Sequence, residues 1–370
     1  MRNLSTILPL GWVFICMTSA LATAQQEPPE TEFKGRIEVT EVLLDVVVTD
    51  ASGNLILGLK PEDFIIHDGD REVNATSATF YSNRRFVDSG LAATRAGVSP
   101  SEIPSDRYFI FLFHDQRFED PELTSNILDA LRWTKDWVEY ESLENDWVAI
   151  ASYDVKLKIH QDFTTSRQLL LEALTSVAKS KDPGSEWPSR IKEETGPSLR
   201  KNLPQGRELS KQTRRVYSAI DLLAESAGHI TGRKNILLFS MGWGKIDTRN
   251  FNTYIPDVRY YPTMVESLND NNVAVYSISW AKNASRENVA QSYLGNLLSD
   301  LSNDTGGIYY FNFVTFKDPL LEVTQDNNGY YLLSYEAEYE AGDKGYREVS
   351  VETRNPNFKV RARKGYRYGV

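Results

Sequence analysis

Residues 108–113 (YFIFLF) form an unbroken apolar run, and this run constrains the fold more than any other feature of the sequence. A strand that is apolar at every position is typical of a sheet covered on both faces, because a half-exposed strand alternates between apolar and polar residues. Further along the chain, apolar strands alternate with segments of helical periodicity. This alternation requires crossover connections, so we predict a doubly wound, mainly parallel α/β sheet within residues 107–328.

The elements of this predicted domain follow one another in chain order. We expect strands at 108–113, 147–151, 235–240, 273–278 and 308–311, and a ribbon at 157–163. We expect helices at 121–140, 166–178, 211–229, 261–271 and 288–303. Residues 179–210 interrupt the pattern, since they are rich in Lys, Glu, Pro, Gly and Ser and contain few apolar residues. That composition predicts a long mobile insertion.

Both ends of the chain have the composition of β-strands instead. The N-terminal part, 36–87, has a strand at 38–49 and a strand pair around 64–67 and 75–80 that flanks the turn 68–70. The C-terminal part, 329–370, has strands at 330–335, 346–351 and 359–363. Neither part has enough strands to close a sandwich alone. We therefore predict one small antiparallel β-sandwich that contains the α/β domain as an insertion, with a linker at 88–106. Two separate β-extensions are the alternative, but they would leave unpaired edges.

The N-terminus predicts export. Arg2 precedes an apolar run at 7–21, and Ala22-Thr23-Ala24 provides a small-residue cleavage site before a polar linker at 25–35. This order is that of a secretory signal peptide covering residues 1–24. The alternative is a membrane anchor, which needs about 20 apolar residues. We expect a secreted or periplasmic protein with no membrane span after cleavage and, because the only cysteine is Cys16, no disulfide.

Charge and motif content exclude several classes of function. The net charge of −10 argues against nucleic acid and anionic lipid as partners, since neither would gain from counterion release. The sequence has no Gly-x-Ser-x-Gly, no His-Glu-x-x-His and no phosphate-binding Gly-x-x-x-x-Gly-Lys motif. We therefore predict a protein that is not an enzyme.

Four segments in a fixed order point to a family. They are 46–50 with Gly53 and 58–64, the strand end Phe113-His114-Asp115, residues 303–307, and residues 363–366. Together they resemble the von Willebrand factor A-related proteins known mainly from acidobacterial genomes. The resemblance implies an A-like fold. It implies little about function, because such proteins are mostly uncharacterised.

The resemblance also implies a place for Mg²⁺ at the carboxyl ends of the central strands. The family pattern is Asp-x-Ser-x-Ser after the first strand, a Thr ahead of a helix, and an Asp after the fourth strand. Here Asp115 matches, but Arg117 and Glu119 replace the two serines. Arg214 falls at the Thr position, with Thr213 one residue away, and residues 240–244 contain no Asp. Mg²⁺ needs oxygen ligands, so we expect a degenerate site with Asp115 as its one remaining ligand and no bound cofactor.

Two hypotheses concern the arginines at this site. Arg117 or Arg214 takes the place of the metal and pairs with Asp115, or Arg117 simply points to solvent. The same edge of the sheet carries aromatic residues. Ligands of open α/β sheets bind outside the carboxyl ends of the strands, and aromatic side chains are favoured anchors. We therefore predict a partner site made of His114, Asp115, Arg117, Tyr153, Arg214, Trp243 and Trp280.

These expectations lead to one functional prediction and two alternatives. We predict an adhesion-type binding protein that holds a protein or glycan of the cell envelope or its surroundings without metal. The first alternative is a structural envelope protein without a ligand site, in which Trp243 and Trp280 only pack loops. The second is a hydrolase that uses Asp115 and Glu119 as paired carboxylates.

Overall fold

The computed structural model describes residues 37–82, 106–119, 121–180, 196–247, 253–280 and 297–369. The expected signal peptide and the linker at 25–35 lie outside these residues, as does nearly all of the expected linker at 88–106. Residues Ile37–Val370 belong to one compact unit. No helix within the described ranges is long and apolar enough to cross a membrane.

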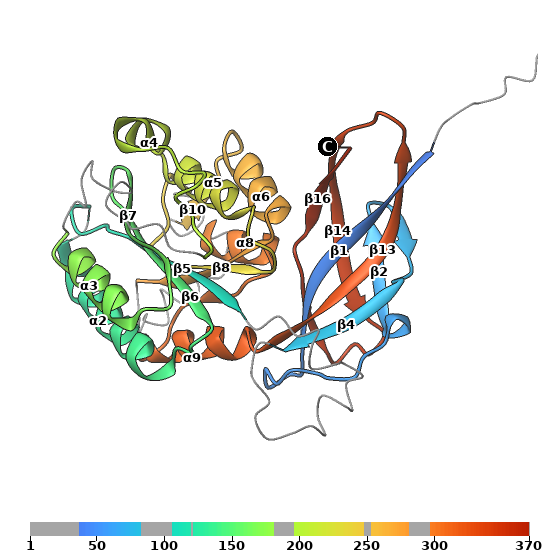
Figure 1. The fold of residues 1–370 in the computed structure, drawn as a ribbon, viewed down its shortest axis with the longest axis horizontal. Coiled ribbons are helices and arrows are strands. Elements are labelled where there is room, and N and C mark those ends of the chain that lie inside the picture. Colours follow the sequence, from blue (N-terminus) through green and yellow to red (C-terminus); the bar gives the residue numbers. More distant parts are fainter. Residues whose placement is uncertain are drawn as a thin grey trace, which may run out of the picture. The chain divides into compact units, whose positions relative to one another are not determined.

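A six-stranded sheet forms the centre of the α/β domain (Figure 1). Its strands are β5 (Arg107–His114), β6 (Asp146–Tyr153), β7 (Leu157–Thr164), β8 (Lys234–Ser240), β11 (Val273–Ser279) and β12 (Tyr309–Tyr310). The spatial order is β12-β11-β8-β5-β6-β7, and every pair is parallel except β6 with β7 at one edge. After β5 the chain forms β6 on one side of β5, and it later returns to form β8 on the other side. The predicted doubly wound sheet is confirmed, and its switch point lies between β5 and β8.

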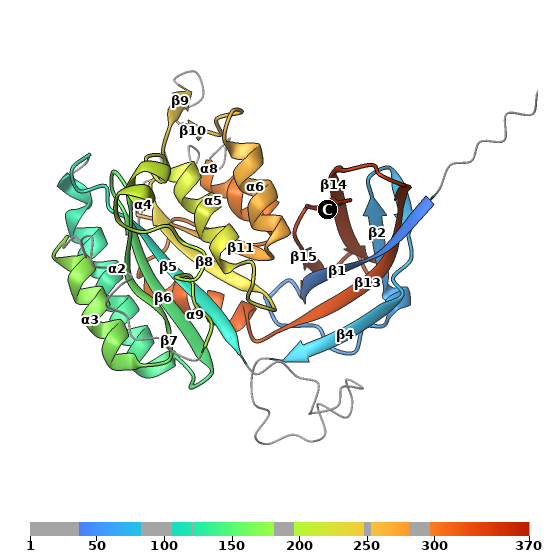
Figure 2. The same ribbon diagram turned by 45° about the horizontal axis from the view of Figure 1, so that its top comes forward.

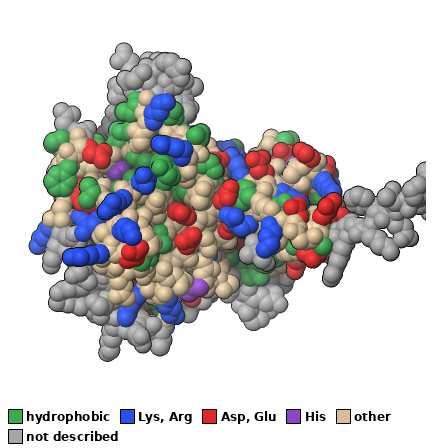
Figure 3. Space-filling view, turned by 90° about the horizontal axis from the view of Figure 1, so that it is seen from above, with side chains coloured by type: hydrophobic (Ala, Val, Ile, Leu, Met, Phe, Trp, Pro, Cys, Tyr) green, Lys and Arg blue, Asp and Glu red, His purple; other side chains and the backbone are tan. Residues whose placement is uncertain are grey.

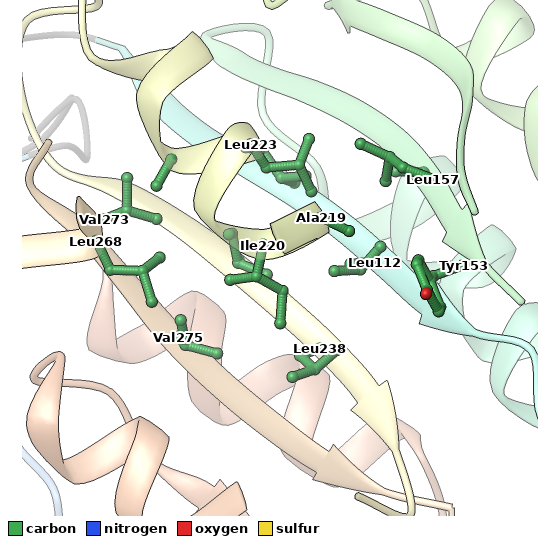
Figure 4. Close-up of a cluster of buried hydrophobic side chains, with 14 of the residues drawn as sticks. Leu112, Tyr153, Leu157, Ala219, Ile220, Leu223, Leu238, Leu268, Val273 and Val275 are labelled. Carbon is green, nitrogen blue, oxygen red and sulfur yellow. The ribbon is translucent and has the colours of Figure 1, made fainter. Parts of the chain in front are cut away.

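Helices cover both faces of this sheet, which explains the unbroken apolar run in β5 (Figure 2). One face packs against α2 (Thr124–Asp136), α3 (Arg167–Ala178) and α9 (Lys317–Asp326). The other face packs against α5 (Val216–Ala227), α6 (Tyr261–Asp270) and α8 (Leu297–Asp304). The second core includes Ile220 and Leu223 of α5 together with Leu238 of β8 (Figure 4). Consecutive residues of β5 therefore alternate between two apolar cores.

Several local expectations need correction. The helix expected at 211–229 is two helices, α4 (Gly206–Gln212) and α5, because Arg215 adopts extended backbone and acts as the N-cap of α5. The expected mobile insertion is too long, since residues 196–210 contribute buried leucines at 199, 203 and 209 to the core. Helix α9 and the small hairpin of β9 (Lys245–Asp247) with β10 (Thr253–Ile255) were not expected. A short π-helical turn, η4 (Trp137–Glu141), extends α2.

Both chain ends build two four-stranded antiparallel sheets. One has the order β15-β1-β13-β4, from β15 (Lys359–Arg361), β1 (Ile37–Thr49), β13 (Gly329–Glu340) and β4 (Ser77–Ser82). The other has the order β16-β14-β2-β3, from β16 (Gly365–Tyr368), β14 (Gly345–Thr353), β2 (Phe64–Asp68) and β3 (Arg71–Val73). Apolar residues of both sheets share one core, so the predicted sandwich is confirmed.

One pairing in the sandwich differs from the expectation. Strands β2 and β4 were expected to form a hairpin across the turn at 68–70, but that turn joins β2 to the short strand β3. Strand β4 pairs instead with β13 in the opposite sheet, where Phe80 lies beside Tyr331. The apolar surface that β4 buries in the sandwich stabilises this pairing by more than the shorter loop of a local hairpin would.

Candidate functional site at the carboxyl ends of the strands

The candidate site lies at the switch point, where β5 and β8 end side by side. Residues His114 to Arg117 leave the end of β5, and Ser240 to Trp243 leave the end of β8. The neighbouring strand β6 ends at Tyr153, whose carbonyl accepts a hydrogen bond from the Asp115 backbone N–H at 2.6 Å. Parallel strands place all these ends on one edge of the sheet, the usual location of ligand sites in such folds.

Arg117 forms a bidentate ion pair with Asp115. Its Nε donates to Oδ1 of Asp115 at 2.8 Å and its Nη2 donates to Oδ2 at 2.5 Å. Ser180 Oγ donates to the same carboxylate at 3.1 Å. Both carboxylate oxygens are therefore engaged by the protein itself. Of the two arginine hypotheses, the geometry matches the one in which Arg117 pairs with Asp115.

The same guanidinium also closes the end of helix α3. Nη1 of Arg117 donates to the Ala178 carbonyl at 3.0 Å, and Nη2 donates to the Val177 carbonyl at 3.2 Å. Carbonyls in the last turn of a helix lack partners within the helix and attract cations. Arg117 thus joins the end of β5 to the end of α3, which explains why it is mostly buried although it lies in a loop.

The charge of Arg117 sets the protonation of Asp115. Burial by itself would raise the pKa of this carboxyl, but the hydrogen bonds and positive charge of Arg117, together with the Ser180 hydroxyl, hold the pKa below its ordinary value. Asp115 is therefore ionised at neutral pH. Its negative charge is already compensated by an internal cation.

Gln116 fills the crevice between β5 and β8, and the sequence analysis missed it. Its Nε2 donates to the Gly242 carbonyl at 3.0 Å, and its Oε1 accepts from the Met241 backbone N–H at 2.8 Å. Only 2% of its surface is exposed. Its position directly after Asp115 at the switch point was the one available signal. Gln116 ties together the two loops that would flank a ligand there.

His114 is a buried, neutral part of the same assembly. Its Nδ1 lies 2.9 Å from Ser240 Oγ, and its ring meets Tyr153 and Trp243 edge-to-face. Burial lowers its pKa from 6.5 to about 4, although the negative charges of Asp115 and Asp154 oppose that shift. The imidazole is uncharged at physiological pH and stabilises the packing of the loops.

The aromatic residues that were expected to contact a partner lie at the predicted strand ends, but their side chains face inward. Trp280 is fully buried and its Nε1 donates to the His114 carbonyl at 3.0 Å. Trp243 and Tyr153 are also buried. A partner cannot reach these side chains, so their prediction as anchors was wrong, as it was for His114. They pack the loops, as the alternative reading of the tryptophans held.

The remaining predicted residues are not partners in the Asp115–Arg117 ion pair. Arg214 is exposed at the start of the turn between α4 and α5. Thr213 is fully buried, and its Oγ1 accepts from the Leu157 N–H and donates to the Leu209 carbonyl. Glu119 is exposed, while Asp115 is bound by Arg117. The two carboxylates therefore do not form an acid/base pair of the kind that a hydrolase needs.

These residues do not fit a Mg²⁺ ion. An octahedral site needs free oxygen ligands, yet both oxygens of Asp115 face a guanidinium and Thr213 Oγ1 is used inside the fold. Within the described parts of the chain, no group of three or more His, Cys, Asp or Glu side chains is placed to hold a metal. Arg117, which stands where the family pattern has a serine, lies against the Asp115 carboxylate.

Four strongly exposed apolar side chains lie on loops that follow strands of the sheet at the same edge, and the sequence analysis missed them too. Phe118 follows β5, Val155 follows β6, Val258 lies in the segment after the hairpin that follows β8, and Val314 follows β12. Each is at least 70% exposed. Their signal in the sequence was weak, because an isolated apolar loop residue is common and becomes informative only beside others.

Positive charge accompanies these apolar residues. Arg215 and Arg259 both lie over the ring of Tyr260, with Cζ at 4.8 and 5.2 Å from the ring centroid. Asp257 neutralises Arg259 at 2.7 Å, whereas Arg214 is exposed beside Arg215. Helix α5 begins directly after Arg215, and helix α6 begins directly after Tyr260. The N-terminus of each helix adds partial positive charge.

Comparison with solved structures finds similar chains at low identity. An aerotolerance-related membrane protein from Bacteroides fragilis matches at 14% identity and a TM-score of 0.36, covering 60% of this chain and 98% of that one. A von Willebrand factor type A protein from Catenulispora acidiphila matches at 7% identity and a TM-score of 0.36, covering 91% and 74%. Manganese-loaded TRAP protein from Plasmodium vivax matches at 9% and 0.36, covering 78% and 96%.

The strand order of the chain itself carries the assignment, because these similarities are low. Six strands lie in the order β12-β11-β8-β5-β6-β7, with the antiparallel strand β7 at an edge and helices on both faces. The α/β domain has a von Willebrand factor A-like fold. No protein-family model and no curated protein matches the sequence.

Proposed function

We propose that this chain is an exported binding protein, without enzymatic activity, that holds a protein partner on the carboxyl-end face of its A-like domain without a metal ion. We define this face by its exposed residues Phe118, Val155, Arg214, Val258 and Val314. The observation that carries the proposal is that the four exposed apolar residues lie on the loops that follow β5, β6, β8 and β12. Exposed apolar side chains rimmed by charge are typical of protein interaction sites.

The ion pair supports a metal-independent mode of binding. In A-domains a partner carboxylate completes the shell of the metal, as the resemblance implies. Here Arg117 compensates Asp115 internally, so the site offers no open coordination position. Positive groups at this face, among the described residues, include Arg214, Arg215 and the N-termini of α5 and α6. Figure 3 shows basic side chains interspersed with apolar ones over the α/β part. Such a surface suits a partner with apolar and acidic side chains.

Capture from a cell-envelope extract tests this proposal. We expect the chain to retain a specific protein equally well with and without chelator. We expect the double variant Phe118→Ser/Val258→Ser to lose it while the melting temperature stays unchanged, because both side chains are exposed. The matched control is Leu57→Ser, an exposed apolar residue of the sandwich, which should retain the partner.

Three outcomes would contradict the proposal. Equal capture by the face variant and the control would favour a structural protein without a ligand site on this face. Loss of capture in chelator would show that binding depends on a metal. Retention of glycans alone, in place of a protein, would assign the face to the other partner class.

A further inference from the structure

A second candidate surface lies away from the carboxyl-end loops, between helix α2 with its π-helical extension η4 and helix α9. It is a groove of about 190 Å³. Aromatic and charged side chains line it, together with two leucines of α9; they are Trp133, Asp136, Trp137, Tyr140, Glu141 and Lys317. We call it the α2/α9 groove. None of these residues takes part in the carboxyl-end face.

Helical geometry brings the rings together. Trp133, Trp137 and Tyr140 are separated by four and three residues, so they share one face of the helix. Trp137 is nearly buried, and its Nε1 donates to Thr324 Oγ1 of α9 at 2.7 Å. That bond fixes the indole between the two helices. Tyr140, by contrast, is 72% exposed. Tyr140 and the half-buried Trp133 therefore offer aromatic surface that water reaches, whereas the buried Trp137 lies beneath them.

The charges of the groove favour a cation. Its lining contains the carboxylates of Asp136 and Glu141 against the single ammonium of Lys317. Glu139 next to the groove and Asp318 in the first turn of α9 add further negative charge. Aromatic faces attract cations through their quadrupole, and nearby carboxylates strengthen that attraction. A neutral sugar would gain nothing from the excess negative charge.

The protein already contains one example of this arrangement. Cζ of Arg132 lies 4.7 Å from the centroid of the Trp133 ring, and its Nη2 donates to Asp129 Oδ1 at 2.5 Å. A guanidinium is thus held between an indole and a carboxylate on the helix that forms the groove. Trp137 and Tyr140 with Asp136 and Glu141 repeat the same combination of groups, and the lining includes one cation, Lys317, against two carboxylates.

We propose that the α2/α9 groove binds a basic side chain, arginine or lysine, presented by a partner polypeptide. The exposed ring of Tyr140 contacts the cation and the apolar stem of the side chain, beside the half-buried Trp133. Asp136 and Glu141 provide the counter-charge. The groove is distinct from the carboxyl-end face, so the chain would contact partners at two places. Its acidic, aromatic character is opposite to that of the carboxyl-end face, which is apolar and basic.

Nuclear magnetic resonance of the indole N–H groups tests the proposal on the full chain. The probe is N-acetyl-arginine amide, and the matched control is the neutral isostere N-acetyl-citrulline amide. We expect saturable shifts of the Trp133 and Trp137 signals with arginine, and binding at least about tenfold weaker with citrulline because the charge is lost. Signals of the buried Trp243 and Trp280 should stay in place.

Charge variants separate the contributions of the lining residues. Asp136→Asn/Glu141→Gln should weaken arginine binding by about tenfold, whereas Lys317→Gln should strengthen it by about twofold, because it removes a competing cation. Equal affinity for arginine and citrulline, no saturable shift, or binding of cellohexaose in place of arginine would overturn the proposal. If the double variant fails to fold, the comparison of the two probes on the unmodified chain still decides.

Discussion

Strand β5 has an arginine–aspartate pair at each end. At its start, Arg107 donates through Nε and Nη2 to Asp146 at 2.6 and 2.8 Å, and both side chains are at most 1% exposed. At its end, Arg117 donates through the same two nitrogens to Asp115, with 14% and 9% exposed. The chemistry is the same, but the first pair lies inside the protein and the second borders the loops at the carboxyl ends of the strands.

The two pairs also differ in what they connect. Arg107 further donates to the Thr324 carbonyl and to Asn328 Oδ1, so it joins β5 and β6 to the end of α9. Arg117 instead joins the end of β5 to the end of α3. A buried pair that is broken leaves a charge without solvent, whereas water reaches a pair near the surface. The two pairs share the same hydrogen-bond geometry, so only their burial and their position in the fold distinguish them.

The largest effect should come from the buried pair. We expect Arg107→Ala to lower the free energy of unfolding by about 3–5 kcal/mol, because Asp146 would remain charged and buried without its partner. Urea denaturation measures this. The double variant Arg107→Met/Asp146→Leu removes both charges and should be less destabilised than the single variant. A single variant as stable as the unmodified chain would remove the distinction between the two ends.

The next effect concerns pH and His114 at the other end of the strand. The folded chain holds its pKa near 4 while the unfolded chain has about 6.5, so only the unfolded state takes up a proton between these values. The stability due to this group is complete above pH 6.5, falls by up to about 3 kcal/mol as the pH drops to 4, and then levels off. We expect His114→Gln to show a smaller loss than the unmodified chain over that range in denaturation curves. Parallel curves for both proteins would refute this.

A smaller loss should follow from the pair at the carboxyl end. We expect Arg117→Ala to cost about 1–3 kcal/mol, since the lost hydrogen bonds to Asp115 and to the end of α3 are partly replaced by water. The contribution of Asp115 has a defined pH dependence. Its folded pKa is lowered, so its stabilisation is present above the ordinary value of 3.8 and is lost as the pH falls through the folded value. Arg117→Ala should therefore lose less stability than the unmodified chain below about pH 4. A loss larger than that of Arg107→Ala would reverse the order of the two pairs.

The smallest expected effect is that of a metal. Millimolar Mg²⁺ or Mn²⁺ should leave the melting temperature unchanged relative to a chelator-treated sample. A ligand stabilises the folded state only when it binds that state, and we expect Arg117 to keep the ion away from Asp115. Differential scanning calorimetry is the measurement. A clear rise of the melting temperature with metal would show that the Asp115–Arg117 pair opens to admit an ion.

The sequence predicted the parts of this protein that local pattern determines. The apolar runs of β5, β8 and β11 indicated a covered parallel sheet, and the β-branched ends of the chain indicated a sandwich. These patterns reflect periodicity, which is a property of neighbouring residues. Helix α9 was not predicted, because few of its positions are apolar. Its stability comes from packing on α2 and the sheet.

The candidate site shows more clearly what could not be predicted from the sequence. The sequence alone determined that Asp115 ends a central strand and that arginine and glutamate replace the serines beside it. It could not determine that Arg117 reaches the end of α3, that Gln116 closes the crevice, or that Trp280 is buried while Phe118 is exposed. The side-chain direction of a loop residue depends on elements that are distant in the chain. Tertiary packing therefore decided which residues of this edge form the interior and which remain available to a partner.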